Sequence, residues 1–132
     1  MIAWDDNYLI GVERIDFEHR IFLDLINNFN QSRLKNENIG VLSGILQEIA
    51  LYAKFHFKSE ENMMQRIHYP DLTEHQNHHR ELIDLFSTKM VGIETKMFSA
   101  KDVEKFLVDW FVNHVTHEDK KISTFIKSTA KQ

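Results

Sequence analysis

The sequence predicts an all-α protein, an antiparallel up-down-up-down four-helix bundle with an extended N-terminal arm. Apolar residues recur at steps of three and four in four successive stretches, which is the period of an amphipathic helix. Each stretch spans roughly 20 residues and therefore about 30 Å. The chain has one proline and four glycines, and no low-complexity linker divides its 132 residues. We therefore expect a single domain over residues 1–132.

Local signals set the limits of the arm and of the first helices. Residues 1–15 are expected to form the arm, and the first helix is expected to begin near Asp16. The polar stretch 32–38 separates this helix from the second. Pro70 ends the second helix and stands near the start of the third, a position that proline favours.

A loop around Gly92 is expected to follow the third helix. Ser99 and Asp102 then match a capping box, a serine followed three residues later by an acid, just before an apolar run. This pattern predicts the start of the fourth helix. The lysine-rich end, about 127–132, is expected to be a frayed tail.

Histidines lie on the apolar stripe of each predicted helix. His56 and Glu60, like His75 and His79, are four residues apart, so both members of each pair share one helix face. Imidazoles and carboxylates that point into a core are costly unless they are satisfied. A metal site would satisfy them together. The five inward histidines are His19, His56, His75, His79 and His114.

The nitrogen and oxygen atoms available limit which metals could bind, but they do not identify the metal. A single histidine on an apolar face is more often a hydrogen-bonded core residue, but five on four helices favour a shared site. The chain has no cysteine, so nitrogen and oxygen are the donors, and these suit iron, zinc, copper or manganese. Five histidines with two carboxylates exceed the needs of one ion and fit two carboxylate-bridged ions. In the last helix, periodicity favours Glu118, four residues after His114.

Composition argues against several classes of partner. The formal net charge is −4, so the chain lacks the excess of positive charge that is typical of proteins that bind nucleic acid. No apolar run approaches the roughly 20 residues that span a bilayer, so membrane insertion is not expected. The N-terminal residues lack the basic and apolar regions of a signal peptide, which favours a cytoplasmic protein. The sequence does not specify a protein partner.

Several motifs in a fixed order resemble the hemerythrin family, more narrowly its single-domain bacterial members. A lone HxxxE or HxxxH motif is weak, but the ordered combination is specific, and it covers nearly the whole chain. The motifs are WDD at 4–6, GVERIDFEH at 11–19, HFKSEE at 56–61, YP at 69–70, WFVNH at 110–114 and DKK at 119–121.

The resemblance implies two iron ions per chain, bridged by carboxylates and by an oxo or hydroxo group. One iron would be left five-coordinate, on the side with two histidines. The implied ligands are His75, His79 and His114 for one iron, His19 and His56 for the other, and Glu60 and Asp119 as bridges.

Asp119 departs from the helical period, and Glu18 departs from the family pattern. Asp119 lies five residues after His114, about 140° around an ideal helix, so the family pattern chooses Asp119 where periodicity favours Glu118. A local distortion of the helix would reconcile the two. Glu18 stands where glutamine is common in the family, and we expect it at the surface or beside a ligand.

The function implied by the resemblance is reversible dioxygen binding, for oxygen storage, transport or delivery, and not enzymatic turnover. The alternatives are a di-iron enzyme (an oxidase, peroxidase or nitric oxide reductase) and an oxygen sensor that acts through a separate partner. Apolar residues near the ligands are candidates for an oxygen pocket, although plain core packing explains them equally well. These candidates are Phe22, Phe57, Trp110 and Val115.

Three histidines fall outside the pattern. His68 has no place in it, and His117 is expected to be solvated or to lie just outside the ligands. His78 lies off the apolar face of the third helix, so we expect it to be exposed.

Overall fold

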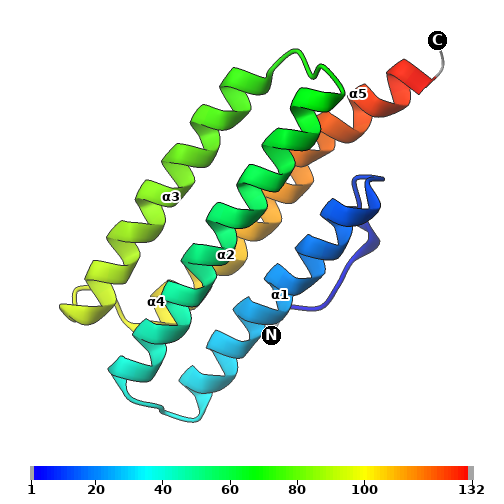
Figure 1. Cartoon of the computed structure of the whole chain (residues 1–132). Coiled ribbons are helices and arrows are strands. Elements are labelled where there is room, and N and C mark those ends of the chain that lie inside the picture. The colour runs from blue at the N-terminus through cyan, green and yellow to red at the C-terminus, as the bar shows by residue number, and fades with distance from the viewer. Residues whose placement is uncertain (1, 131–132) are drawn as a thin grey trace.

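The chain forms an all-α antiparallel four-helix bundle, as the sequence predicts (Figure 1). The computed structural model describes residues 2–130. Over that range four helical rods follow one another along the chain, and the fourth contains a π-helical turn. The rods are α1 (Glu13–Leu34), α2 (Ile39–Arg66), α3 (Leu72–Glu94), and a last rod of α4 (Ala100–Asn113), the π-helical turn η2 (His114–Asp119) and α5 (Lys120–Ala130).

The rods pack in a ring around one core. Helix α2 contacts α1 and α3, and α4 contacts the same two helices from the other side. The four apolar stripes meet inside this ring, where side chains such as Phe29, Leu46, Phe86 and Leu107 are almost fully buried. Each such side chain contributes about 1.5–3 kcal/mol relative to its exposed state. The ring therefore gives every helix an inward face on which a site can be built.

A second, smaller apolar cluster lies at the end of the bundle away from the main core. It contains Met64, Tyr69 and Ile122. Along α2 and along the last rod, the polar residues of the expected metal site fall between the main core and this small cluster. The site is therefore enclosed by apolar packing on both sides. No helix within residues 2–130 combines the length and the apolar character needed to cross a bilayer.

Helix α1 begins at Glu13, three residues before the expected start near Asp16. The Asp16 carboxylate does not cap the helix, because it accepts hydrogen bonds from the backbone N–H groups of Ile10 (2.7 Å) and Gly11 (3.2 Å). The arm is thus fastened to the first turn of α1, with Gly11 at a φ of +89° that glycine adopts without strain. The expected arm of residues 1–15 ends at residue 12, and it contains a short 3-10 turn, η1 (Asp6–Tyr8).

Two further boundaries differ from the expectation. Helix α3 continues through Gly92, where the Phe98 ring packs so closely that a side chain would fit only if this ring moved. Helix α5 extends through Ala130, so most of the tail predicted to fray is helical. Just before this segment, Ile122 and Phe125 of the same helix pack into the small cluster. Residues 131–132 of the predicted tail lie outside the described residues. The predicted Ser99–Asp102 capping box is confirmed.

Candidate metal centre

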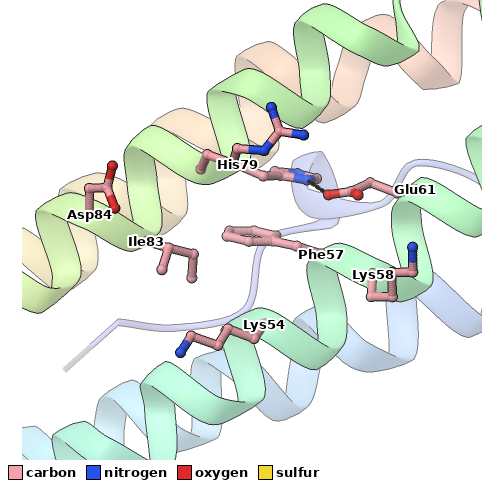
Figure 2. A pocket seen from close by; sticks show the side chains of 8 residues that line it. Lys54, Phe57, Lys58, Glu61, His79, Ile83 and Asp84 are labelled. Atoms are coloured by element: carbon pink, nitrogen blue, oxygen red, sulfur yellow. Dashed lines mark hydrogen bonds and ion pairs between the residues drawn. The ribbon is translucent and has the colours of Figure 1, made fainter.

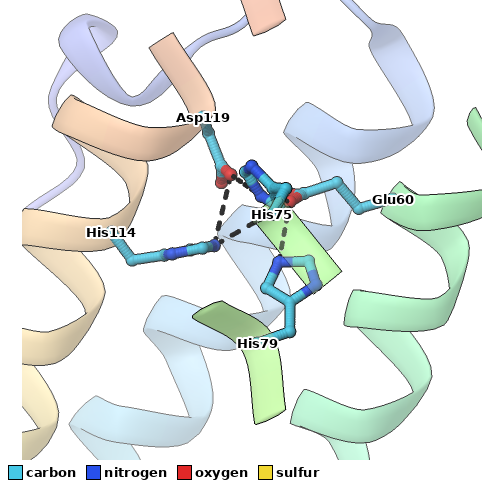
Figure 3. Close-up of side chains that lie close together, drawn as sticks. All are labelled: Glu60, His75, His79, His114 and Asp119. Atoms are coloured by element: carbon cyan, nitrogen blue, oxygen red, sulfur yellow. Dashed lines mark hydrogen bonds and ion pairs between the residues drawn. The ribbon is translucent and has the colours of Figure 1, made fainter. Parts of the chain in front are cut away.

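All seven side chains expected to bind metal converge in one buried cluster. They come from every rod of the bundle: one from α1, two from α2, two from α3 and two from the π-helical turn η2. Each residue is at most 5% exposed. Figure 3 shows five of them pointing toward one another from three rods. The seven are His19, His56, Glu60, His75, His79, His114 and Asp119.

The Glu60 carboxylate lies between the histidines of α3 and those of α1 and α2. Its Oε1 atom is 2.7 Å from Nε2 of His75 and 3.1 Å from Nε2 of His79. Its Oε2 atom is 3.4 Å from Nε2 of His56 and 3.8 Å from Nε2 of His19. One carboxylate therefore faces two groups of imidazoles, each through a different oxygen.

The Asp119 carboxylate also faces both groups of imidazoles, each through a different oxygen. Its Oδ1 atom is 3.2 Å from Nε2 of His114 and 3.3 Å from Nε2 of His75. Its Oδ2 atom is 3.2 Å from Nε2 of His19. Two overlapping sets of donors result, one with three histidines and one with two, and both include Glu60 and Asp119. This is a geometry in which two carboxylates can bridge two ions.

The π-helical turn explains why Asp119 joins the cluster. In a π-helix the hydrogen bonds run from residue i to i+5, so the turn holds one residue more than an α-helical turn. His114 and Asp119, five residues apart, consequently face the same way. Glu118, which simple periodicity favours, is directed outward and lies 3.4 Å from the Lys121 ammonium. The periodic expectation of Glu118 is therefore wrong, because the backbone departs from the α-helical period here.

Several nitrogen and oxygen atoms of the cluster that could bind a metal have no hydrogen-bond partner. They include the Nε2 atoms of His19, His56 and His114 and both carboxylate oxygens of Asp119. Buried polar atoms without a partner are rare in folded proteins because their desolvation is uncompensated. Imidazole nitrogens and carboxylate oxygens are suitable donors for first-row metal ions. The arrangement therefore fits the bound metal that the sequence predicts.

Outer hydrogen bonds orient three of the imidazoles. His56 Nδ1 lies 2.8 Å from Oε1 of Glu18, and His79 Nδ1 lies 2.8 Å from Oε2 of Glu61. His19 Nδ1 is 3.4 Å from the backbone oxygen of Tyr8. When Nδ1–H donates to these acceptors, the Nε2 lone pair is directed into the cluster. Periodicity gives no signal for Glu18, which lies about 100° around α1 from His19 and is buried only because α2 packs there.

The charges of the cluster shift the ionisation of its histidines. Burial alone would lower the pKa of His19 and of His75, but the nearby carboxylates of Asp119 and Glu60 outweigh it and raise each pKa to about 10. The same balance raises the pKa of His114 to about 9. For Glu60 burial acts to raise the pKa, and the surrounding histidines hold it well below its usual range. In the metal-free protein the cluster is thus a network of opposite charges.

The stability of the metal-free protein is expected to pass through a maximum between about pH 4.5 and 6.5. The raised histidine pKa values give stability that is complete below the ordinary value of 6.5 and is lost as pH rises toward 9–10. The lowered pKa of Glu60 gives stability present above its ordinary value of 4.5 and lost as pH falls. Urea denaturation across pH measures this. Equal stability at pH 6 and pH 9 would contradict the charge network.

Aromatic side chains form the wall around the cluster. The Phe57 ring stacks on His79 with centroids 3.9 Å apart, and the Trp110 ring lies parallel to His114 at 6.4 Å. Phe22 meets His56 edge-on at 5.9 Å. Phe111 meets His19 edge-on at 6.1 Å, a contact that the sequence reasoning missed. Val115, the remaining candidate for the oxygen pocket, is 2% exposed and packs in the main core.

An open cleft of about 340 Å³ lies between α2 and α3, outside this wall (Figure 2). Phe57 and His79 line it, together with Glu61, which accepts the outer hydrogen bond of His79. Lys54 and Arg80 also line it. Solvent therefore approaches the three-histidine side of the cluster more closely than the burial of the ligands alone suggests.

The three remaining histidines differ in their surroundings. His68 and His117 are exposed, and neither belongs to the two groups of side chains among residues 2–130 that could hold a metal ion. His78 is half-buried, which corrects the expectation that it is exposed. Its ring stacks on that of His114 with centroids 5.2 Å apart, so the packing of α3 against the last rod covers it.

Known proteins similar to this chain include a family of cation-binding domains, which agrees with a metal site at the cluster. Residues 10–126 match the family model described as the hemerythrin HHE cation binding domain. The chain belongs to the hemerythrin family. It is 28% identical to a bacteriohemerythrin of Clostridium acetobutylicum, over 91% of this chain and 97% of that protein. It is 22% identical to a bacteriohemerythrin of Stenotrophomonas maltophilia, over 100% and 86%.

Solved hemerythrin structures share the fold closely. The crystal structure of a hemerythrin point mutant superposes with a TM-score of 0.83 at 25% sequence identity, covering 94% of this chain and 95% of the other. A hemerythrin-like protein of Naegleria gruberi is 27% identical over 89% of this chain and 87% of its own length. The protein is thus of the bacteriohemerythrin type, and iron is the metal that its family implies.

Proposed function

We propose that this protein binds dioxygen reversibly at a pair of iron ions held by the seven clustered side chains. The observation that carries the proposal is the division of the cluster into a three-histidine set and a two-histidine set that share Glu60 and Asp119. Membership of the hemerythrin family supports iron over the other metals that these donors accept. Oxygen storage, transport or delivery would each use the same site.

The two sets of donors are unequal, and this inequality supports an open position. The set with His75, His79 and His114 contains five residues, whereas the set with His19 and His56 contains four. An ion with fewer protein ligands keeps a position for an external molecule. We therefore assign the dioxygen-binding side to His19 and His56.

The residues around that side suit a small apolar guest. Phe22 and Phe111 meet the rings of His56 and His19 edge-on, and both are 1% exposed. A ferrous pair, when bound, supplies the two electrons that dioxygen accepts on binding and returns on release. The aromatic wall would keep water and protons from the site and so protect the reduced state.

The candidate pocket residues contact different sides of the cluster. Phe22 contacts His56 on the proposed dioxygen-binding side, and Trp110 stacks on His114 of the three-histidine set. Phe57 contacts both sets, because its ring stacks on His79 and also lies 5.9 Å from that of His56. Val115 packs in the core next to His114 in the chain. We propose that Phe22 forms the pocket together with Phe111, and that the other three complete its enclosure.

A carrier role is favoured over an enzyme by the surroundings of His19 and His56. The rings of Phe22, Phe57 and Phe111, which carry no ionisable group, contact these two imidazoles. Tyr52 also contacts His56, but its hydroxyl donates to the backbone oxygen of Glu18. A di-iron oxidase, peroxidase or nitric oxide reductase would use a group that delivers protons to its substrate. The cytoplasmic location and the absence of a nucleic-acid partner remain predictions.

The optical spectrum of the ferrous-loaded protein tests this proposal. Under argon the protein should be nearly colourless, it should develop visible absorption on exposure to oxygen, and the absorption should disappear again under vacuum. Irreversible oxidation in the first cycle would contradict the carrier role. Turnover of peroxide or nitric oxide faster than oxygen release would favour the enzyme.

A further inference from the structure

A buried carboxylate stands directly behind one histidine of the two-histidine set. Glu18 is 4% exposed, and its Oε1 atom lies 2.8 Å from Nδ1 of His56. Its Oε2 atom accepts hydrogen bonds from Oγ of Ser59 (2.9 Å) and from Nε of Arg14 (3.1 Å). The carboxylate therefore has partners on both oxygens, and these partners hold it in one orientation.

The geometry couples the charge of Glu18 to the metal through the imidazole. His56 donates its Nδ1–H to Glu18 and presents Nε2 to the cluster, 3.4 Å from Glu60. A carboxylate at Nδ1 makes an imidazole a stronger electron donor at Nε2. A stronger donor stabilises the more highly charged, oxidised ion relative to the reduced one.

A second carboxylate–imidazole pair lies on the other side of the cluster and provides a comparison. Glu61 lies 2.8 Å from Nδ1 of His79, the same distance as in the Glu18 pair. The Glu61 side chain is 17% exposed, against 6% for Glu18, and it lines the open cleft in Figure 2. Solvent and salt screen an exposed charge more than a buried one. Glu18 is therefore the stronger electrostatic influence of the two.

We propose that Glu18 is a positioning residue that lowers the reduction potential of the ion bound on the His19 and His56 side. The proposal rests on the proposed function for the identity of the metal and for the open side. It assigns Glu18 a role in the balance between tight oxygen binding and irreversible oxidation. A lower potential strengthens electron donation to dioxygen and also speeds loss of the ferrous state.

The Glu18→Gln variant of the iron-loaded full chain tests this role, because glutamine keeps the shape and an acceptor oxygen but removes the charge. We expect a rise in midpoint potential corresponding to a roughly tenfold change in the oxidation equilibrium, about 59 mV for one electron. Autoxidation in air should slow on the order of tenfold. Glu61→Gln should shift the potential in the same direction by less than half as much.

Two further variants separate electrostatics from structure. Tyr52→Phe removes the hydroxyl that donates to the backbone oxygen of Glu18 (2.8 Å), so it should lower Tm without moving the potential. Ser59→Ala removes a donor that partly neutralises Glu18, so it should lower the potential, opposite to Glu18→Gln. This opposite sign tests the role even when Glu18→Gln folds poorly, because alanine is a favourable helix residue.

The outcomes distinguish this role from the function on which it rests. A native-like potential in Glu18→Gln with both irons bound would overturn the role, as would an equal shift in Tyr52→Phe. An unchanged or raised potential in Ser59→Ala would also overturn it. If the native protein holds two irons but never releases oxygen, the proposed function fails. The midpoint potentials of the variants do not depend on oxygen release, so they test the role of Glu18 in that case too.

Discussion

Replacing Glu60 by alanine is expected to abolish binding of both metal ions and to destabilise the metal-free protein. The Glu60 carboxylate faces both sets of histidines, so its loss removes a donor from each. In the metal-free protein it is also fully buried beside protonated imidazoles, whose charge would then lack a partner. Breaking a buried charge pair costs about 3–5 kcal/mol. Iron content and urea denaturation at pH 6 measure the two effects.

The control for this variant is Glu48→Ala, which changes an exposed glutamate on the same helix. It should keep the native iron content, and its free energy of unfolding should change by less than about 0.5 kcal/mol. Two firmly bound irons in Glu60→Ala would contradict the bridging geometry.

Asp119→Ala and Glu118→Ala are expected to differ sharply although the two residues are neighbours. Asp119 is fully buried and lies within 3.3 Å of histidines from both sets, so its loss should release iron and end oxygen binding. Glu118 pairs with Lys121 at the surface, and exposed pairs of this kind contribute at most about 1 kcal/mol. Glu118→Ala should therefore bind two irons and oxygen like the native chain.

This pair of variants tests the π-helical turn directly. Iron content and visible absorption after oxygenation would report both residues in one experiment. If Glu118→Ala lost iron while Asp119→Ala retained it, the last rod would follow the ordinary α-helical period in the metal-bound protein. The assignment of Asp119 would then be wrong.

Helical period was sufficient to predict the bundle and most of the cluster. The inward stripes of α2 and α3 carry His56, Glu60, His75 and His79 because residues four apart share a face, and the structure brings these four together. Prediction of this kind works where the backbone follows the regular α-helical period. It fails at η2, where the extra residue turns Asp119 inward in place of Glu118.

Helical period does not decide whether Glu18 lies at the surface or beside a ligand, and it places His78 wrongly, because both positions depend on contacts between helices. Glu18 is off the inward face of α1, and it becomes buried only because His56 and Ser59 of α2 pack against it. His78 is covered by the ring of His114 from the last rod. The early start of α1 has a similar origin, because Asp16 binds the backbone of the arm. Helical periodicity concerns the residues of a single helix. Contacts between one helix and another segment therefore produce no periodic signal in the sequence.

Anaerobic titration of the metal-free protein with ferrous ions tests the central claim most directly. The claim is that seven side chains from all four rods hold two ions in two sets that share Glu60 and Asp119. We expect saturation at two ferrous ions per chain, with protons released because His19, His75 and His114 are protonated beforehand. Saturation at one ion per chain would contradict it.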